Sequence, residues 1–440
     1  MRKNLVILHL ESVSQSAFWQ FMADLPELWK LSARSGNFRR FYTASTSSVM
    51  SMCEMLHGDS AELDHNPVFP RHKDGLAGRS SNLFQVLLDR GYATKGVQYG
   101  SFCLGDAPNN FWGIWPYACG QFIRHDKIEE FHGDIRHFIR ESKAKNRPFA
   151  LYHWNMSTHI RNDPESDFEE LGFAKRFKVK YRLLDESVKR LLDDLAEAGV
   201  LDNTIIAAYG DHGDDFWGHG LSRGRTHVIE PYATVCWTPF FIFNNGFDRG
   251  IFDNLASNID IKPTLLSMLF PDMPAETGAS LFAGVNLISG SRKTAFSQSI
   301  FALQLEHSDP CQAVIKSYAV TNGEIRLMAS SGGNKPEEGG MELFLEQWDF
   351  GNTKNLLDFF QLDKNGRIAA FDSHGAVHPH FTMSFTRQRI VSLAGTYDLL
   401  RQNLADFIAA KEREAMKISR DGKKQLFPME MFKVVRKKRR

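Results

Sequence analysis

The chain has 440 residues, of which 42% are hydrophobic and 24% charged; this balance is typical of a folded globular protein and excludes a disordered or fibrous chain. Its formal net charge of +1 excludes a protein built mainly to bind nucleic acid through its overall charge. Five widely spaced cysteines without a CxxC pair argue against a disulfide framework and predict a reducing, cytoplasmic location.

Neither end of the sequence predicts a membrane anchor. Residues 1–4 lead directly into an apolar run that Glu11 cuts short, so we expect no export signal. The longest apolar runs, such as residues 233–243, fall well below the roughly 18–20 residues that cross a bilayer. Residues 433–440 include six Lys or Arg, which we interpret as a solvated tail or as a weak contact for anionic surfaces.

Apolar segments typical of buried strands alternate along the chain with amphipathic segments typical of helices. The predicted strands cover residues 5–10, 36–42, 91–99, 148–154, 203–209 and 238–243, and the predicted helices cover residues 18–31, 50–56, 81–90, 128–142, 175–198 and 259–269. This alternation predicts an α/β fold with a doubly wound, mostly parallel sheet flanked by helices.

The pattern changes after about residue 290. Two predicted antiparallel strands, residues 313–320 and 325–329, are separated by a turn at Thr321-Asn-Gly323, and a helical segment follows over residues 390–410. We therefore expect three parts: a catalytic α/β domain over 1–290, a smaller C-terminal α+β subdomain that completes the fold over 291–385, and a helical tail with a basic C-terminus over 386–440.

Polar side chains follow two of the predicted strands at their carboxyl ends. Asp211 and His212 come directly after residues 203–209, between glycines that allow a sharp turn, and Glu11 follows the first strand. Open α/β sheets place ligands at this edge, and carboxylates with an imidazole suit Zn²⁺ or Mn²⁺. The competing interpretation is a polar, glycine-rich surface loop.

A run of hydroxyl side chains, six in nine residues, covers residues 43–51. Such a run can simply cap a helix. A hydroxyl at a helix N-terminus is also well placed as a nucleophile, because backbone N–H groups and the helix dipole stabilise an anion there.

Taken in order, these segments resemble the sulfatase/alkaline phosphatase superfamily, and they are most similar to its sulfatase-like hydrolase and transferase branch. The resemblance runs through most of residues 4–360 and includes Thr158-His159 after a strand, Trp237-Thr-Pro-Phe-Phe-Ile242 and Asp260-Ile-Lys-Pro-Thr-Leu-Leu266. It implies a metal-dependent enzyme rather than an inactive chain.

The differences between this chain and typical sulfatases limit which reactions the resemblance implies. Sulfatases carry a Cys or Ser followed by x-Pro-x-Arg, which is modified to formylglycine, whereas residues 44–50 contain neither proline nor arginine and Glu54 follows Cys53. Sulfatases also usually open with paired aspartates, where this chain has Glu11-Ser12. A Glu, a Thr and an Asp-His pair instead resemble the site of the phosphoethanolamine transferases and lipoteichoic acid synthases, which work through a covalent phosphothreonine with Zn²⁺ or Mn²⁺.

The resemblance implies a role for particular residues. Glu11, Thr46, Asp211 and His212 would hold the metal, Zn²⁺ or Mn²⁺ before Ca²⁺ or Mg²⁺, and Thr46 would be the nucleophile. Counting the register from Gly58 favours Ser45 as the nucleophile instead.

Three histidines complete the predicted site. His159, His219 and His227 are candidate donors to the transferred group, and an imidazole suits proton transfer to the leaving alkoxide at neutral pH. His227, in Thr226-His-Val-Ile-Glu-Pro-Tyr232, matches the histidine that precedes Pro-Tyr in the transferases and could instead bind a second metal. His9, between apolar neighbours, is interpreted as a packed strand residue, and the aromatic loop of residues 111–117 as packing or as a cleft wall.

We therefore expect a hydrolase or a phosphoethanolamine- or phosphoglycerol-type transferase that acts on phosphate esters through a covalent hydroxyl-phosphate intermediate, with a glycan as one candidate acceptor. One alternative is a sulfuric ester hydrolase that works without formylglycine. A second alternative is an inactive pseudo-enzyme that binds a glycan.

Overall fold

The computed structural model describes residues 2–60, 81–100, 122–159, 173–216, 219, 230–243, 249–273, 283–303, 313–331, 340–346, 349, 352, 355–371 and 387–418. The aromatic loop of residues 111–117, His227 and the basic C-terminus all lie outside these described residues.

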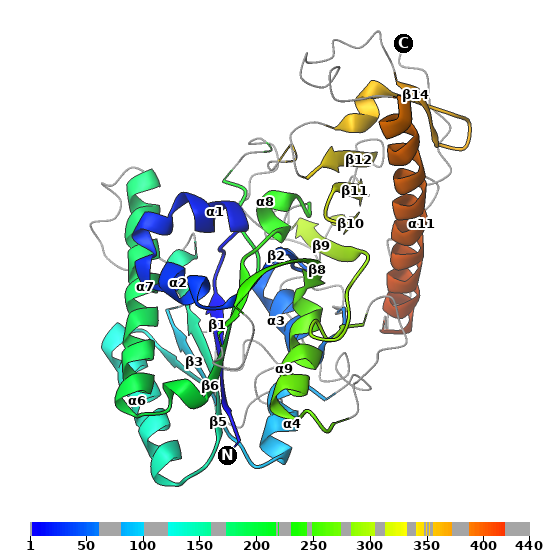
Figure 1. The fold of residues 1–440 in the computed structure, drawn as a ribbon. Helices are drawn as coiled ribbons and strands as arrows, with labels where there is room; N and C mark the ends of the chain where they lie inside the picture. The colour runs from blue at the N-terminus through cyan, green and yellow to red at the C-terminus, as the bar shows by residue number, and fades with distance from the viewer. Residues whose placement is uncertain are drawn as a thin grey trace.

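An eight-stranded sheet forms the centre of the larger lobe (Figure 1). Its order is β4-β3-β5-β1-β6-β7-β2-β8, with β1 Asn4–Leu10, β2 Gly36–Tyr42, β3 Ala93–Tyr99, β4 Phe122–His125, β5 Phe149–Asn155, β6 Thr204–Gly210, β7 Phe240–Phe243 and β8 Gly250–Ser257. Every neighbouring pair is parallel except those of β7, which runs antiparallel to both β6 and β2. The predicted doubly wound, mostly parallel sheet is confirmed.

Strand β1 shows why the sheet is buried on both faces. All seven of its residues are buried, and alternate residues enter different apolar clusters: Leu5 and Ile7 pack on one face, Val6 and Leu8 on the other. Each such side chain contributes about 1.5–3 kcal/mol of hydrophobic free energy when it is fully removed from water.

Helices cover the two faces of the sheet in two groups (Figure 1). One face carries α1 Gln15–Gln20, α2 Pro26–Ala33, α6 Ile128–Ala144 and α7 Phe173–Glu197, and the other carries α3 Ser48–His57, α4 Leu83–Asp89 and α9 Ile261–Leu269. Helix α7 matches the predicted segment 175–198, and α3 lengthens the predicted segment 50–56 at its N-terminus to Ser48.

The prediction of one helix over residues 18–31 is wrong. The structure has α1, a short 3-10 turn over Met22–Asp24, and then α2, which begins at Pro26. Proline lacks the N–H of a helix interior and disfavours helical geometry in the residue before it, so Leu25 breaks the helix and Pro26 starts the next one.

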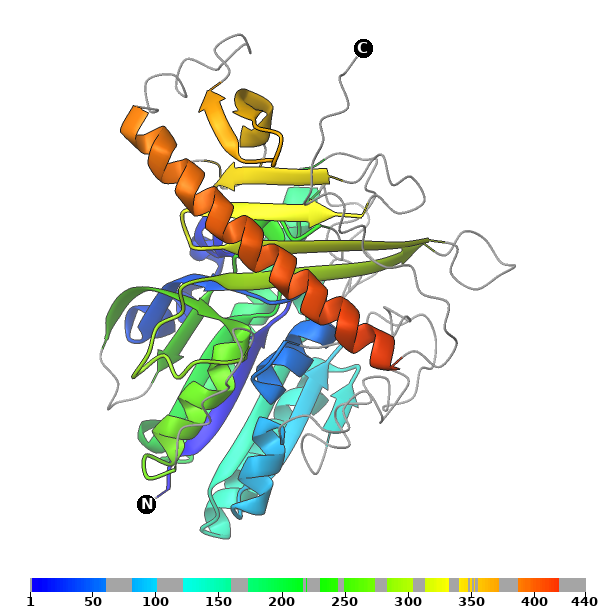
Figure 2. The ribbon, with the colours of Figure 1, turned by 90° about the vertical axis from the view of Figure 1, so that its right-hand side faces the viewer.

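The smaller lobe contains a four-stranded antiparallel sheet, β12-β11-β10-β9, and a long helix that crosses it (Figure 2). Its elements are β9 Ala295–Leu303, β10 Ala313–Thr321, β11 Ile325–Ser330, β12 Gly340–Leu345, a hairpin of β13 Phe360–Leu362 and β14 Ile368–Phe371, and α11 Arg387–Ile418. The predicted hairpin around residues 321–323 is confirmed by the β10–β11 pairing. Apolar side chains of α11, among them Tyr397, Leu404 and Phe407, share one buried cluster with the sheet.

The structure does not supply a membrane-crossing element: none of the helices in the described ranges combines the length and the hydropathy that a bilayer crossing requires.

Candidate active site

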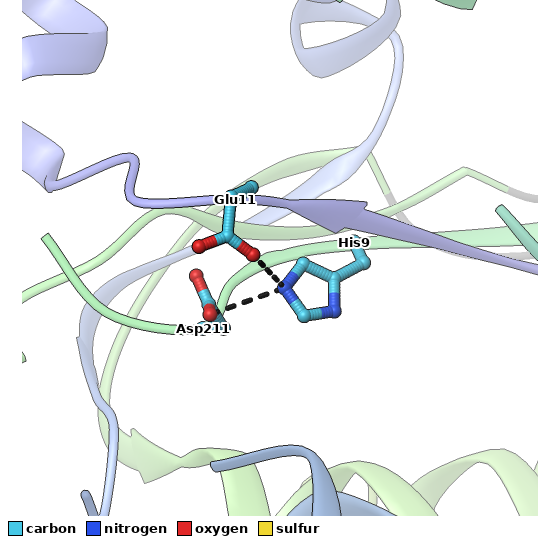
Figure 3. Close-up of side chains that lie close together, drawn as sticks. All are labelled: His9, Glu11 and Asp211. Atoms are coloured by element: carbon cyan, nitrogen blue, oxygen red, sulfur yellow. Dashed lines mark ion pairs between the residues drawn. The ribbon is translucent and has the colours of Figure 1, made fainter. Parts of the chain in front are cut away.

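Strand pairing brings the predicted carboxylates together. Leu10 pairs with Gly210 at the carboxyl ends of the parallel strands β1 and β6, so Glu11 and Asp211 both stand one residue beyond that pair. Both side chains are completely buried. Figure 3 shows their carboxylates facing each other beside the ring of His9.

The backbone around this pair is tightly constrained. Ser12 adopts a positive φ of 56° and donates its N–H to Asp211 Oδ1 at 2.9 Å. Gly213 has no room for a side chain, because a Cβ there would lie 2.3 Å from the carbonyl oxygen of Thr234 and 2.5 Å from Ser14 Cβ. The turn after β6 therefore requires glycine and holds Asp211 and His212 against the turn after β1.

Glu11 is held by donors from several elements. The indole Nε1–H of Trp154, in β5, donates to Glu11 Oε2 at 2.8 Å, and the Ser12 hydroxyl donates to Oε1 at 3.2 Å. The Thr158 hydroxyl fixes the backbone by donating to the Glu11 carbonyl at 2.6 Å. The carboxylate is thus aligned before any ligand binds.

His212 presents one nitrogen to the carboxylates. Its Nδ1 lies 3.0 Å from the Gly213 carbonyl, which can only accept, so Nδ1 carries the hydrogen. Nε2 then faces Asp211 Oδ2 at 3.3 Å and Glu11 Oε1 at 3.8 Å. A backbone carbonyl that fixes the tautomer in this way is a common partner of a metal-binding histidine.

The hydroxyl that reaches this cluster belongs to Ser48, the first residue of α3. Ser48 Oγ donates to Glu11 Oε1 at 3.0 Å and lies 3.0 Å from His212 Nε2. The preceding residue, Ser47, makes no side-chain capping hydrogen bond in the described structure, which leaves the first-turn N–H groups of α3 without that partner. Ser48 was not singled out from the sequence.

The predicted nucleophiles Thr46 and Ser45 lie in the segment between β2 and α3. The Thr46 N–H donates to the Gln298 carbonyl at 3.3 Å, and Ser45 forms an isolated bridge with Gln298 of β9. Ser45 Oγ is buried and has no hydrogen-bond partner among the described residues. The small lobe therefore supports this segment through β9, while Ser48 makes the contacts to Glu11 and His212.

The two predicted donor histidines that the structure describes, His159 and His219, have different surroundings. His159 is buried at the end of the turn after β5, close enough for its charge to act on Glu11. His219 stacks on Tyr232, and its two ring nitrogens contact Asp215 Oδ1 at 2.7 Å and the Asn352 carbonyl at 3.0 Å. These contacts tie His219 to the small lobe.

His9 is the residue that sequence reasoning missed. Its Nε2 lies 3.3 Å from Glu11 Oε2 and 3.1 Å from Asp211 Oδ2 (Figure 3). The available signal was the strand period of two, which puts residues 9 and 11 on the same face. Burial opposes protonation of His9, but the charges and contacts of Asp211 and Glu11 outweigh it and raise its pKa to about 9.

The same interactions shift the pKa values of Glu11 and Asp211. Burial raises the pKa of Glu11, but the contact and charge of His9, helped by His159 and His212, hold that pKa well below its usual range. For Asp211, burial and the charge of Glu11 raise the pKa, while His212 and His9 bring it below its ordinary value. Both carboxylates are therefore ionised inside the protein.

This donor set fits a divalent cation. Asp211 Oδ2 and His9 Nε2 are completely buried atoms without a hydrogen-bond partner of acceptable geometry in the described part of the chain. Ser48 has one hydroxyl proton to share between Glu11 and the unprotonated Nε2 of His212. Two carboxylates, imidazole nitrogens and a hydroxyl converge here, and His9, Glu11 and Asp211 each offer an atom within 4.8 Å of the others. A divalent cation would satisfy the two carboxylates and the unprotonated Nε2 of His212.

Comparison with known proteins agrees with this architecture. The family model described as Sulfatase matches residues 3–269, so the chain belongs to the sulfatase family, whose members are enzymes. An uncharacterized sulfatase, YdeN of Escherichia coli, is 29% identical over 150 residues, which cover 31% of this chain and 26% of YdeN. Lipoteichoic acid synthase of Staphylococcus aureus is 30% identical over 97 residues, which cover 20% of this chain and 14% of the synthase.

Similarity to solved structures extends over more of the chain. The structure of BT1596, a 2-O GAG sulfatase, aligns with 95% of this chain and 94% of its own, with a TM-score of 0.63 at 15% identity. The chain spans about a quarter or less of the length of the curated relatives it matches. Together the comparisons establish the family and the fold.

Proposed function

We propose that this protein is a metal-dependent hydrolase or transferase of phosphate esters, and that Ser48 is its nucleophile. One observation carries the proposal: the hydroxyl of Ser48, the first residue of α3, lies 3.0 Å from both Glu11 Oε1 and His212 Nε2. Glu11, Asp211, His212 and Ser48 would hold the cation, which when bound supplies a Lewis acid that lowers the pKa of the hydroxyl.

The chain's own residues account for the first bond exchange. Ser48 Oγ attacks phosphorus, the bond from phosphorus to the leaving alcohol breaks, and the serine proton passes to Glu11 Oε1, the carboxylate oxygen to which Ser48 already donates at 3.0 Å. The first-turn N–H groups and the dipole of α3 stabilise the negative equatorial oxygens. His159 is the proposed acid that protonates the leaving alkoxide.

The serine also favours phosphate over sulfate. Formylglycine sulfatases work through a modified side chain, and residues 48–52 of this chain, Ser-Val-Met-Ser-Met, lack the proline and arginine that accompany that modification. A single serine hydroxyl forms an ester that is released by a second attack on the central atom, which is the course of two-step phosphoryl transfer. Water as the second nucleophile gives hydrolysis, and an acceptor hydroxyl gives transfer.

The relatives support one class of donor or acceptor. One relative is a lipoteichoic acid synthase and one structural neighbour is a GAG sulfatase, which supports a glycan-bearing polymer as donor or acceptor. Similarity to the GAG sulfatase over most of the chain also supports the second candidate function, hydrolysis of a sulfate ester without formylglycine. We also propose the cytoplasm as the compartment, which the sparse cysteines support and cell fractionation would test.

The test compares aryl phosphate, aryl phosphodiester and aryl sulfate substrates on purified protein supplied with Zn²⁺ or Mn²⁺. The proposal expects the phosphate esters to be cleaved faster, and Ser48→Ala to lose at least ~1000-fold in kcat, as removal of a nucleophile does. Thr46→Ala and Ser45→Ala are matched controls from the same segment. Faster sulfate cleavage would favour the second candidate, and binding of glycans without any turnover would favour an inactive glycan-binding protein.

A further inference from the structure

His9 is a polar residue in a completely buried strand of the sheet. It is completely buried, and its neighbours in β1, Leu8 and Leu10, belong to the core. A core histidine normally satisfies both nitrogens with hydrogen bonds. Among the described residues His9 does so at Nδ1 alone, which lies 2.6 Å from the Tyr152 hydroxyl.

The other nitrogen points at the proposed metal site. We propose that His9 Nε2 is a further ligand of the cation held by Glu11, Asp211 and His212, so that the site contains two imidazoles and prefers Zn²⁺ to Ca²⁺ or Mg²⁺. This inference rests on the proposed function, because it requires that site to bind a cation.

The spacing of the donor atoms supports a shared ion. Zn²⁺ bonds to nitrogen and oxygen at about 2.0–2.1 Å, so two ligands of a tetrahedral ion stand about 3.4 Å apart. His9 Nε2 is 3.1 Å from Asp211 Oδ2 and 3.3 Å from Glu11 Oε2. His212 Nε2 is 3.3 Å from Asp211 Oδ2. Each of these separations is compatible with two donor atoms that bind the same ion.

The position of the ring places His9 Nε2 between the two carboxylates that would hold the cation. Although His9 Nε2 lies within ion-pair distance of both carboxylates, neither contact has the geometry of a hydrogen bond in the described structure. Asp211 Oδ2 likewise has no such partner among the described residues. In Figure 3 one ring nitrogen of His9 faces both carboxylates, and the dashed lines mark its ion pairs with Glu11 and Asp211.

The outer contacts of His9 are those of a metal-binding histidine. The Nδ1–H can donate to the Tyr152 hydroxyl, which in turn contacts the Tyr209 hydroxyl at 2.8 Å. The ring stacks on Trp154 with centroids 4.7 Å apart, and the same indole donates to Glu11 Oε2. An oxygen that accepts the second ring N–H fixes the tautomer and raises ligand basicity.

The types of ligand atom then determine which metal ion the site prefers. Ca²⁺ takes six to eight oxygen ligands and Mg²⁺ an octahedron of oxygens, whereas imidazole with carboxylate suits Zn²⁺. With His9 and His212 both bound, nitrogen would supply two of the protein ligands. This composition predicts a strong discrimination against the two alkaline-earth ions.

The test counts imidazoles on the metal and measures selectivity on the full chain. Zn²⁺-loaded wild-type protein is examined by zinc-edge X-ray absorption, and apoprotein is titrated with Zn²⁺ and Ca²⁺ by calorimetry. His9→Gln is the test variant, and His153→Gln is the control, since His153 is equally buried in the adjacent strand β5 but contacts Ser187 on the other side of the sheet. Asp211→Asn tests the site itself.

We expect two imidazoles in wild-type protein and in His153→Gln, and one in His9→Gln. Outer-sphere changes usually cost ~10–100-fold in affinity, so loss of a direct ligand should weaken Zn²⁺ binding by ~100-fold or more and lower the preference for Zn²⁺ over Ca²⁺. If His9→Gln does not fold, the wild-type count decides: two imidazoles support the inference, and one overturns it.

The outcomes separate this inference from the proposed function. One imidazole in wild-type protein, with Zn²⁺ lost in Asp211→Asn, overturns the role of His9 and leaves the site of Glu11, Asp211 and His212 intact. Zn²⁺ retained at wild-type affinity by Asp211→Asn, or no Zn²⁺ bound by wild-type protein, contradicts the proposed site and the inference together.

Discussion

Removing one hydrogen-bond donor from Glu11 should weaken metal binding measurably. Trp154→Phe deletes the indole N–H that donates to Glu11 Oε2 at 2.8 Å and keeps an aromatic ring where Trp154 stacks on His9. A hydrogen bond to a buried charged group contributes about 1.5–3 kcal/mol. Since about 1.4 kcal/mol corresponds to tenfold in affinity, Zn²⁺ should bind about 10- to 100-fold more weakly.

Calorimetric titration of apoprotein with Zn²⁺ measures this change directly. Trp29→Phe is the control, because Trp29 is 40% exposed on α2 and should leave the affinity unchanged. Activity at saturating Zn²⁺ should fall less than the affinity does, since the nucleophile is untouched. Equal Zn²⁺ affinity in Trp154→Phe and wild-type protein would refute the reasoning that an aligned Glu11 binds the cation.

Three further predictions concern the scaffold. In Asp185→Ala, α2 loses the α7 carboxylate that accepts from the N–H groups of Glu27 and Leu28 at 2.8–3.0 Å, so chemical denaturation should show a loss of about 1–2 kcal/mol. In Gly213→Ala the new Cβ would overlap the Thr234 carbonyl, so kcat should fall sharply. Gly133→Ala is the control: a Cβ at residue 133 meets open space, so kcat should not change. Burial lowers the pKa of His153 from 6.5 to about 3. Between pH 6.5 and pH 3 the His153 ring is therefore protonated in the unfolded chain but not in the folded protein, so the folded protein becomes less stable as the pH falls. Replacing His153 with Gln should therefore reduce the stability lost between pH 6.5 and about pH 5 by about 1.5 kcal/mol in urea unfolding.

A specific result would contradict each of these three predictions. Asp193→Ala removes an exposed carboxylate of the same helix and should cost less than about 0.5 kcal/mol, so an equal loss in both aspartate variants would contradict the capping role of Asp185. Full activity in Gly213→Ala would show that the turn tolerates a side chain. An unchanged pH slope in His153→Gln would mean that His153 is protonated in the folded protein.

Strand periodicity and strand ends made the framework of the site predictable. Seven consecutive buried residues in β1 and seven in β6 identify central parallel strands, and ligands gather at the ends of such strands. Glu11 and Asp211 could therefore be selected from the sequence alone, and the register of Leu10 with Gly210 places them side by side. Their role as metal ligands stays a prediction.

Which hydroxyl group lies beside Glu11 could not be predicted from the sequence in the same way. Thr46, Ser47 and Ser48 are consecutive, and which one reaches Glu11 depends on where α3 begins and how it packs. That position is set by long-range contacts, such as Asn258 Nδ2 donating to the Ser51 carbonyl and Gln298 Nε2 donating to Glu54. No local pattern encodes either contact.

His9 illustrates a different difficulty. A single histidine among apolar residues is usually a core residue, and only its spacing of two from Glu11 hinted otherwise. Its contact with Asp211 joins residues 202 positions apart in the sequence, through the pairing of β1 with β6. The break at Pro26, in contrast, was available locally, because proline is favoured at the first turn of a helix and disfavoured inside one.

Mapping the covalent adduct tests the central claim most directly. Protein mixed briefly with an aryl phosphate, quenched in acid and digested should yield a peptide that carries one phosphoryl group on Ser48, and Ser48→Ala should yield none. A phosphoryl group on Thr46 or Ser45, or full turnover by Ser48→Ala, would contradict the proposal that the serine hydroxyl beside Glu11 and His212 attacks the substrate.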